Sequence, residues 1–456
     1  MRRNERHLEF RLTTIILTAM LLAMALLPAF AMGDVNANGS YSASTSAPES
    51  HLSPLFCSAF RLQDSNGNPI IGSNAGLPDD IWVPGGGWVM VNKRNVLKTG
   101  VDLIPDQQPA KWISKYGSIT INTTGREFAG EGVNEAGLMV QVLALTSASV
   151  PPEDSRPYVV GWLQWAQYQL DNSSTVEEVI ASNSIIRTGA ASAPDAPQHV
   201  WVCDRTGDSA VIEFYGGEMH IHSTTGEPDM PYPAITNSSY EESVSYLSQF
   251  EGFGGDDTIP DESADDSLSR FVQAAYWMKE YDGESDPIDY TFNALDYIGQ
   301  GSTVLKVVYD LHNLRIYFHT RENSNIGYLD LDSFDFSCET PVTMLDVKTS
   351  LSGDVSDDFI IYDPEANHRM VEALYNYAYT YFGGTPPEGL IDTISQYPES
   401  TYPLASDFKG PAGPEGPAGP EGPQGDDASA VLGIVAIILA VIAVILVIVF
   451  KVTARR

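Results

Sequence analysis

The chain has 456 residues, long enough for a large hydrophobic core, and its 60 acidic against 25 basic side chains give a formal charge of −35. A surface this acidic repels phosphate backbones, which argues against a nucleic-acid partner. Three cysteines are too few for a disulfide scaffold. Their odd number leaves at least one thiol free; Cys203 and Cys338 either pair or stay unpaired and buried.

The N-terminal segment carries export signals. Residues 1–31 are typical of a secretory signal peptide, because arginines precede an apolar run and Ala29 and Ala31 occupy the small-residue positions of a cleavage site after Ala31. Residues 32–56 are rich in Ser, Ala, Asn and Gly, which indicates a pro-segment without a packed core. Signal cleavage alone would leave Met32 first, so exposing Cys57 requires a second cut.

Cys57 stands at the head of a predicted hairpin, with strands at 57–63 and 69–72 joined by a turn at 64–68. If the chain is cut before it, this residue carries both a thiol and a free α-amine. The amine can act as base for the thiol, because an α-amino group titrates at about 7.7–8.0. This is the logic of an N-terminal nucleophile (Ntn) hydrolase; a small buried cysteine in a strand is the alternative interpretation.

Residues 57–397 are predicted to form the globular catalytic domain. Thr175 and Glu178 have the spacing of a capping box that opens a helix. Strands are expected at 87–94, 117–122 and 138–145, a three-stranded meander at 199–222, a hairpin at 304–319, and helices at 158–170, 267–281, 287–298 and 365–382. Hairpin-paired strands mixed with blocks of helix predict an α+β fold in which helices cover antiparallel sheets.

The C-terminal region predicts a membrane anchor. Residues 398–428 form a linker with a collagen-like Gly-x-y repeat, which indicates a stiff stalk. Residues 429–450 are predicted to be a transmembrane helix, because an uncharged run of this length crosses about 30 Å of bilayer. The basic tail at 451–456 is expected in the cytoplasm. The predicted location is the cell membrane, single-pass, with the catalytic domain extracellular.

Four motifs follow Cys57 in order: Trp112-Ile-Ser-Lys-Tyr-Gly-Ser, Gly130-Glu-Gly-Val-Asn-Glu-Ala-Gly-Leu, Thr236-Asn-Ser and Ser269-Arg-Phe. Together they make the sequence, from Cys57 to beyond Tyr328, resemble the choloylglycine hydrolase and penicillin V acylase family of linear amide C–N hydrolases. The resemblance implies an αββα four-layer sandwich, the Ntn hydrolase fold.

The resemblance also implies roles for individual residues. Cys57 matches the nucleophile, Asn237 the oxyanion-hole asparagine, and Asn134 the position whose backbone N–H supports that hole. Arg270 matches an arginine that supports the site electrostatically. The family has an aspartate shortly after the first hairpin, where this chain has none, and we expect Asp80 to fill that role after a register shift.

The expected function is hydrolysis of an N-acyl amide without a metal or organic cofactor. By resemblance the candidate substrates are conjugated bile salts, penicillin V and N-acyl homoserine lactones, and a homo-oligomer is possible. His220 and His222 share a strand face, but no third metal ligand is evident nearby, which favours surface histidines. The alternative function is a catalytically inactive binding or structural module on a collagen-like stalk.

Overall fold

A computed structural model of the chain describes residues 56–403 except for 102–107, 150–155, 157, 190–197, 227, 300 and 382. The predicted signal peptide, nearly all of the pro-segment, the collagen-like repeat, the transmembrane helix and the cytoplasmic tail lie outside these residues. Among the helices in the described part of the chain, none is both long and apolar enough to cross a membrane.

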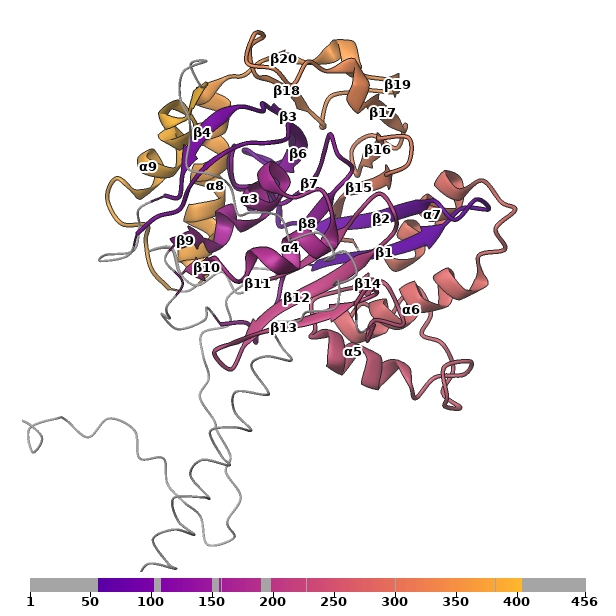
Figure 1. Cartoon of the computed structure of the whole chain (residues 1–456). Coiled ribbons are helices and arrows are strands. Elements are labelled where there is room, and N and C mark those ends of the chain that lie inside the picture. The colour runs from indigo at the N-terminus through magenta and orange to yellow at the C-terminus, as the bar shows by residue number, and fades with distance from the viewer. Residues whose placement is uncertain are drawn as a thin grey trace, which may run out of the picture. The chain divides into compact units, whose positions relative to one another are not determined.

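Two large sheets form the centre of the domain (Figure 1). The seven-stranded sheet has the order β14 (Ala234–Ile235), β1 (Phe56–Gln63), β2 (Pro69–Gly76), β15 (Thr303–Asp310), β16 (Arg315–Thr320), β17 (Gly327–Asp330) and β19 (Gly353–Asp354). The nine-stranded sheet has the order β13 (Glu218–Ser223), β12 (Ser209–Tyr215), β11 (Gln198–Cys203), β8 (Met139–Ala144), β7 (Glu131–Asn134), β6 (Ser118–Asn122), β3 (Trp88–Asn92), β18 (Thr343–Asp346) and β20 (Ile360–Ile361). Neighbouring strands are antiparallel except for the β17–β19 pair.

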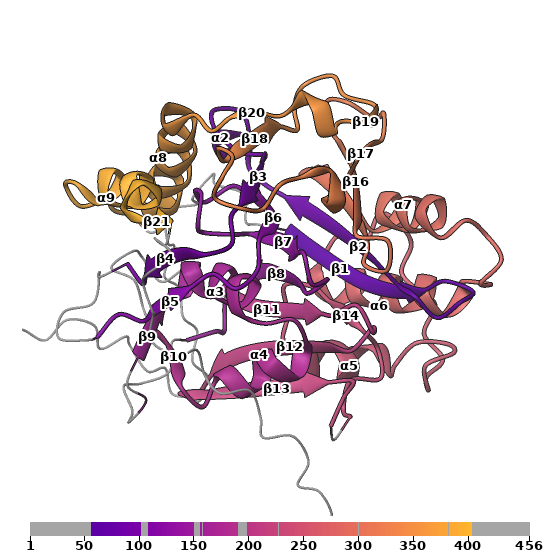
Figure 2. The ribbon, with the colours of Figure 1, turned by 45° about the horizontal axis from the view of Figure 1, so that its top comes forward.

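Helices cover the outer face of each sheet (Figure 2). The seven-stranded sheet is covered by α6 (Ser267–Glu280) and α7 (Pro287–Ile298), with α5 (Tyr240–Leu247) packed against α6. The nine-stranded sheet carries α3 (Trp165–Asn172), followed along the chain by α4 (Val176–Ser182). This helix–sheet–sheet–helix order agrees with the expected αββα arrangement. Three further helices, α2 (Asp79–Trp82), α8 (Pro364–Tyr381) and α9 (Leu390–Gln396), pack together beside the sheets.

The alternation of side chains along β1 and β2 separates a helix-facing side from a sheet-facing side. Phe60 lies opposite Gly72 on the side of α7, and a Cβ at Gly72 would come within 2.6 Å of Thr291 on that helix. Glycine therefore lets α7 approach the sheet closely. On the other side, Cys57 and Ser73 face the nine-stranded sheet, since Ser73 Oγ accepts a hydrogen bond from Gln141 in β8.

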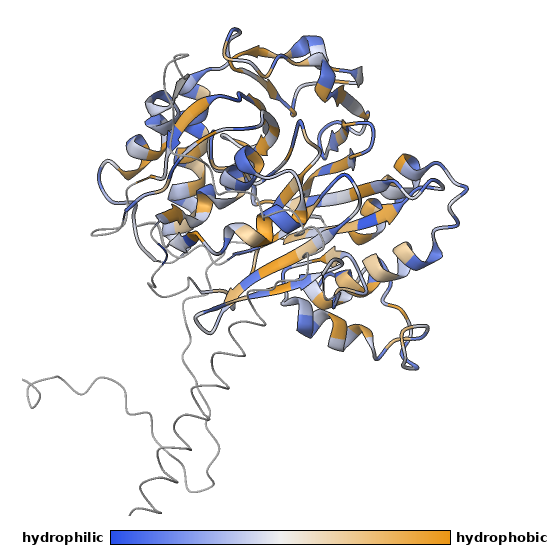
Figure 3. Ribbon diagram, viewed as in Figure 1, coloured by the Kyte–Doolittle hydropathy of each residue, from blue (hydrophilic) through white to orange (hydrophobic). Residues whose placement is uncertain are grey.

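Apolar residues concentrate on the central strands, and hydrophilic residues on the loops and outer helix faces (Figure 3). Within this interior lies a cluster of buried charges around Lys98. The Lys98 ammonium contacts the carboxylates of Glu127 at 2.5 Å and Asp171 at 2.9 Å, and all three side chains are at most 1 % exposed. Trp112 Nε1 also donates to Asp171, so part of the Trp112 motif has a structural role.

Most predicted elements are confirmed, including the meander and the cap of α4, where Thr175 Oγ1 accepts from the Glu178 N–H at 3.2 Å. The predicted helix at 158–170 is partly wrong. Its first residues form β9 (Tyr158–Gly161), which pairs in parallel with β10 (Ile186–Gly189), and helix α3 starts only at Trp165. Tertiary pairing overrides helical spacing here, where the β-branched Val159 and Val160 suit a strand. All three cysteines are free, so Cys203 and Cys338 do not pair.

Candidate active site

Cys57 lies near the start of β1 and opens onto a cavity of about 380 Å³. The cavity is mostly apolar, and its walls come from β1, β7, β8, β15, the loop after β14, and α8. Of the described residues that line it, Glu131 is the only one with an acidic side chain and Arg270 the only one with a basic one. A nucleophile, one cation and one carboxyl group thus meet in a largely apolar space.

Three of the predicted site residues are joined by hydrogen bonds. The backbone N–H of Cys57 donates to Asn237 Oδ1 at 2.8 Å. Arg270 at the start of α6 donates from Nη1 to the Cys57 carbonyl oxygen at 2.5 Å and from Nη2 to Asn237 Oδ1 at 2.9 Å. The structure therefore brings Cys57, Asn237 and Arg270 together, from segments far apart in the sequence.

The amide of Asn237 is oriented from both ends. Its Oδ1 accepts the two bonds just described, while Nδ2 donates one hydrogen to the Ala144 carbonyl oxygen at 2.9 Å. An amide nitrogen carries two hydrogens, so a second one is left for an oxygen beside Cys57. This geometry suits an amide that stabilises a developing oxyanion.

A buried pair supports the loop that carries Asn237. His199 Nε2 donates to the carbonyl oxygen of Thr236 at 2.7 Å, and His199 Nδ1 lies 2.9 Å from Glu213 Oε1. The same Glu213 oxygen accepts the Tyr240 N–H at the start of α5. Both side chains of the pair are fully buried, and these hydrogen bonds fix the loop at its base.

With Phe56 still attached, burial raises the pKa of the Cys57 thiol from 9.0 to about 11. A hydrogen bond with the Gly76 backbone and the nearby Arg270 charge lower it, and the Glu131 carboxylate raises it slightly. Desolvation dominates because the thiolate would form in a largely apolar cavity. The thiol is therefore protonated at neutral pH as long as Cys57 is an internal residue.

Glu131, in β7, was not selected from the sequence, yet it lies on the cavity wall. Tyr309 donates its hydroxyl to Glu131 Oε2 at 3.1 Å, and Ser73 also bonds the carboxyl group. Burial raises the pKa of Glu131 from 4.5 to about 7, although these two bonds oppose the shift. Glu131 is part of the motif that begins at Gly130, but it was missed because the resemblance assigned a role only to Asn134 in that motif.

Helix α8 supplies a further wall that lies outside every motif recognised in the sequence. Its residues on the cavity are Leu374, Tyr375, Tyr377, Ala378 and Tyr381. They follow Cys57 by more than 300 residues, so only the tertiary structure shows that they belong to the site.

The structure does not bring Asn134 to the site. Its backbone N–H, expected to serve the oxyanion, already donates to the Leu138 carbonyl oxygen at 3.0 Å within the β7–β8 turn. Its side chain donates to the carbonyl oxygens of Leu170 at 2.9 Å and Ser173 at 2.7 Å. Asn134 thus ties the turn to the end of α3, and it does not line the cavity.

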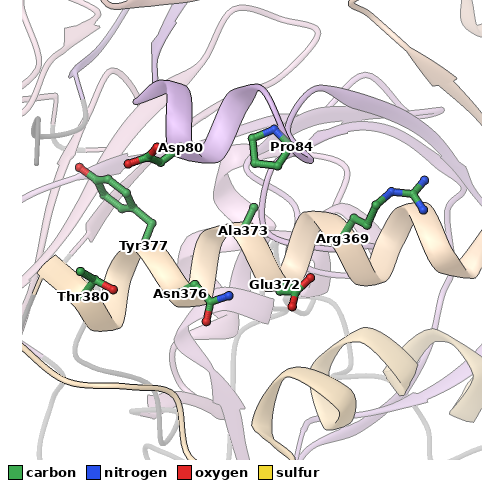
Figure 4. Close-up of a pocket in the computed structure, with 8 residues that line it drawn as sticks. All are labelled: Asp80, Pro84, Arg369, Glu372, Ala373, Asn376, Tyr377 and Thr380. Atoms are coloured by element: carbon green, nitrogen blue, oxygen red, sulfur yellow. The ribbon is translucent and has the colours of Figure 1, made fainter.

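Asp80 is also placed away from Cys57. It is exposed on the first turn of α2 and faces α8, beside Tyr377, in a separate pocket (Figure 4). The physical reason is that the chain leaves β2 at Gly76 and turns into α2, where Ile81 lines the Cys57 cavity while Asp80 points into the separate pocket against α8. The predicted register shift therefore does not supply the acid.

The fold is a sandwich of two sheets covered by helices, and its cavity contains a cysteine held by an amide and a guanidinium group. These features define the class of protein as a hydrolase with a cysteine nucleophile. The chain belongs to the linear amide C–N hydrolases of the choloylglycine hydrolase family, which match residues 57–344. It therefore acts on carbon–nitrogen bonds other than peptide bonds. The match begins at Cys57 and ends before α8.

Individual relatives agree with this assignment. A penicillin V acylase of Pectobacterium atrosepticum is 27% identical over 272 residues, which cover 51% of this chain and 70% of that protein. The solved penicillin V acylase of Agrobacterium tumefaciens has a TM-score of 0.57 and 25% identity, over 68% of this chain and 98% of that one. A variant of the conjugated bile acid hydrolase of Clostridium perfringens shares the fold, with a TM-score of 0.53 and 18% identity over 65% of this chain and 98% of that one.

Proposed function

We propose that this protein is an extracellular, membrane-anchored enzyme that hydrolyses N-acyl amides through Cys57, after removal of all residues before it. The observation that carries the proposal is the set of hydrogen bonds joining Cys57, Asn237 and Arg270 on one apolar cavity. The family match that begins at Cys57 supports the position of the cut.

In the proposed mechanism the freed α-amine of Cys57 takes the thiol proton, and the thiolate attacks the acyl carbon of the amide. The carbonyl oxygen becomes an oxyanion that accepts the remaining Nδ2 hydrogen of Asn237. The ammonium group returns its proton to the leaving nitrogen, the C–N bond breaks, and an acyl thioester remains. Water, deprotonated by the same amine, then releases the carboxylic acid and restores the thiol.

The amine is essential to this scheme, because a peptide nitrogen has no usable lone pair. In the described chain that nitrogen is bonded to Phe56 and donates to Asn237. The same hydrogen bond would hold the amine beside the thiol after cleavage. Arg270, bonded to the Cys57 carbonyl oxygen, would keep the new N-terminus in place.

Because the cavity is mostly apolar, we propose an amide whose acyl group is apolar, and penicillin V is a practical probe. We expect the purified active protein to begin at Cys57 and to hydrolyse penicillin V. A Cys57→Ala variant should fold but lose this activity. The matched control is Cys203→Ala, which removes a thiol from the sheet away from this cavity. A folded Cys57→Ala protein with full activity would exclude the mechanism, and Met32 as the only N-terminus would favour the binding module.

The membrane location rests on the sequence patterns of residues 1–31 and 429–450. We expect the full chain in the membrane fraction, with its catalytic domain released by protease added to intact cells. Recovery of the full chain from the soluble fraction alone would contradict the anchor.

A further inference from the structure

Glu131 has no part in the mechanism above, although it shares the cavity with Cys57. It lies at the start of β7 and is only 6 % exposed. Gln141 Nε2 donates to Ser73 Oγ at 2.6 Å, which leaves the Ser73 hydroxyl hydrogen free to donate to Glu131. With the Tyr309 hydroxyl, the carboxyl group has two neutral donors.

The strand register places this carboxyl group close to the nucleophile. Cys57 lies opposite Ala75, and Ser73 is opposite Ala59 on the same face of the hairpin. Cys57 and Ser73 are therefore diagonal neighbours, which lie roughly 7–8 Å apart between Cα atoms in an antiparallel pair. Since Ser73 bonds Glu131, the carboxyl group lies within electrostatic reach of Cys57, and its charge acts on the thiol.

The groups around Glu131 and Cys57 that bond or electrostatically influence either residue come from five elements. They are Cys57 itself (β1), Ser73 (β2), Gln141 (β8), Tyr309 (β15) and Arg270 (α6). The guanidinium of Arg270 is bonded to Asn237 and to the Cys57 carbonyl oxygen. Removal of Phe56 would add a second cation, because the new α-amine is protonated over part of the neutral range.

We propose that Glu131 is the positioning acid of this site: its carboxylate orients the freed α-amine of Cys57 and stabilises the ammonium form that holds the thiol proton. It thereby replaces the acidic residue that β2 lacks and that Asp80 does not supply. The inference rests on the proposed function, since the amine exists only after the cut.

The proposal has a defined pH signature. A nearby anion raises the pKa of an amine, and an opposite charge within 4–6 Å shifts a pKa by about 1–3 units. Glu131→Gln removes the anion, so the acid-side midpoint of kcat/KM moves to lower pH. Tyr309→Phe removes a bond that lowers the pKa of Glu131, so more of Glu131 is protonated and neutral near pH 7, and the midpoint moves in the same direction by a smaller amount.

The test measures penicillin V hydrolysis against pH in the full chain and in Glu131→Gln, Tyr309→Phe and Glu135→Gln. Glu135 is the matched control, because it pairs with Arg94 at 2.6 Å and does not line the cavity. We expect Glu131→Gln to lower kcat roughly 10- to 100-fold, as misplacement of a reacting group does, with KM unchanged. Glu135→Gln should match the unmodified protein in rate and in pH profile.

The outcomes separate this inference from the function beneath it. If the mature chain begins at Cys57 but its Glu131→Gln variant keeps the normal kcat and pH profile, the inference about Glu131 is overturned and the proposed function is not. A rise in KM without a change in kcat also overturns it, and makes Glu131 a contact for a cationic substrate group. A chain that retains Phe56 overturns the proposed function and this inference together. If Glu131→Gln does not fold, Tyr309→Phe decides the question: a midpoint that moves to lower pH supports the inference, and an unchanged midpoint overturns it.

Discussion

The reactivity of Cys57 should depend on whether Phe56 is attached. In the described chain the thiol has a pKa of about 11, against 9.0 for an unperturbed thiol. Two pKa units correspond to about 3 kcal/mol and to a thiolate population about 100-fold smaller at neutral pH. Because the thiolate is the reactive species, we expect the unprocessed chain to react with iodoacetamide at Cys57 roughly 100-fold more slowly than an ordinary peptide thiol at pH 7.

The assay is carbamidomethylation followed by mass spectrometry, in the unprocessed chain and in a chain that begins at Cys57. Cys338 is exposed and serves as the internal marker that the reagent is active. Restricted access would slow the reaction equally at every pH, whereas a raised pKa makes the rate increase about tenfold per pH unit up to about pH 10. A profile in the unprocessed chain that levels off below about pH 9 would refute the desolvation argument. In the chain that begins at Cys57, the reaction rate should level off at a lower pH than in the unprocessed chain. If it levels off at the same pH or a higher one, the proposed role of the amine is refuted.

Three further predictions concern the oxyanion amide, the buried charges and α8. Asn237→Ala should lower kcat roughly 10²–10³-fold, the usual loss for one oxyanion donor, and an effect confined to KM would make Asn237 a binding residue. Lys98→Met leaves Glu127 and Asp171 buried without the cation between them, so the free energy of unfolding should fall by about 3–5 kcal/mol; an unchanged denaturation midpoint would contradict this. Leu374→Ala removes apolar surface from the cavity wall and should raise KM for an amide with a long apolar acyl group roughly tenfold relative to a short one; equal KM ratios across a series of acyl lengths would show that α8 does not contact the acyl group.

Local structure and the identity of the reacting groups could be predicted from the amino-acid sequence alone. The turn at Gly67, the cap at Thr175 and the alternation along β1 depend on neighbouring residues, so their elements could be predicted within a few positions. Cys57, Asn237 and Arg270 were found because each sits in a short motif whose residue type the chemistry requires. The structure brings these three together by hydrogen bonds.

Which neighbouring groups complete the site depends on how the strands and layers pack in three dimensions. Asn134 matched a motif, but its N–H is used by a tight turn, and no local pattern shows whether a backbone donor is already bonded. Asp80 follows the first hairpin in sequence, but after β2 the chain turns into α2, and Asp80 lies in a separate pocket against α8. Glu131 came into reach only because the two sheets pack face to face and place β7 against β2 and β15. Such contacts depend on strand pairing and layer packing over long sequence separations, which residue spacing does not encode.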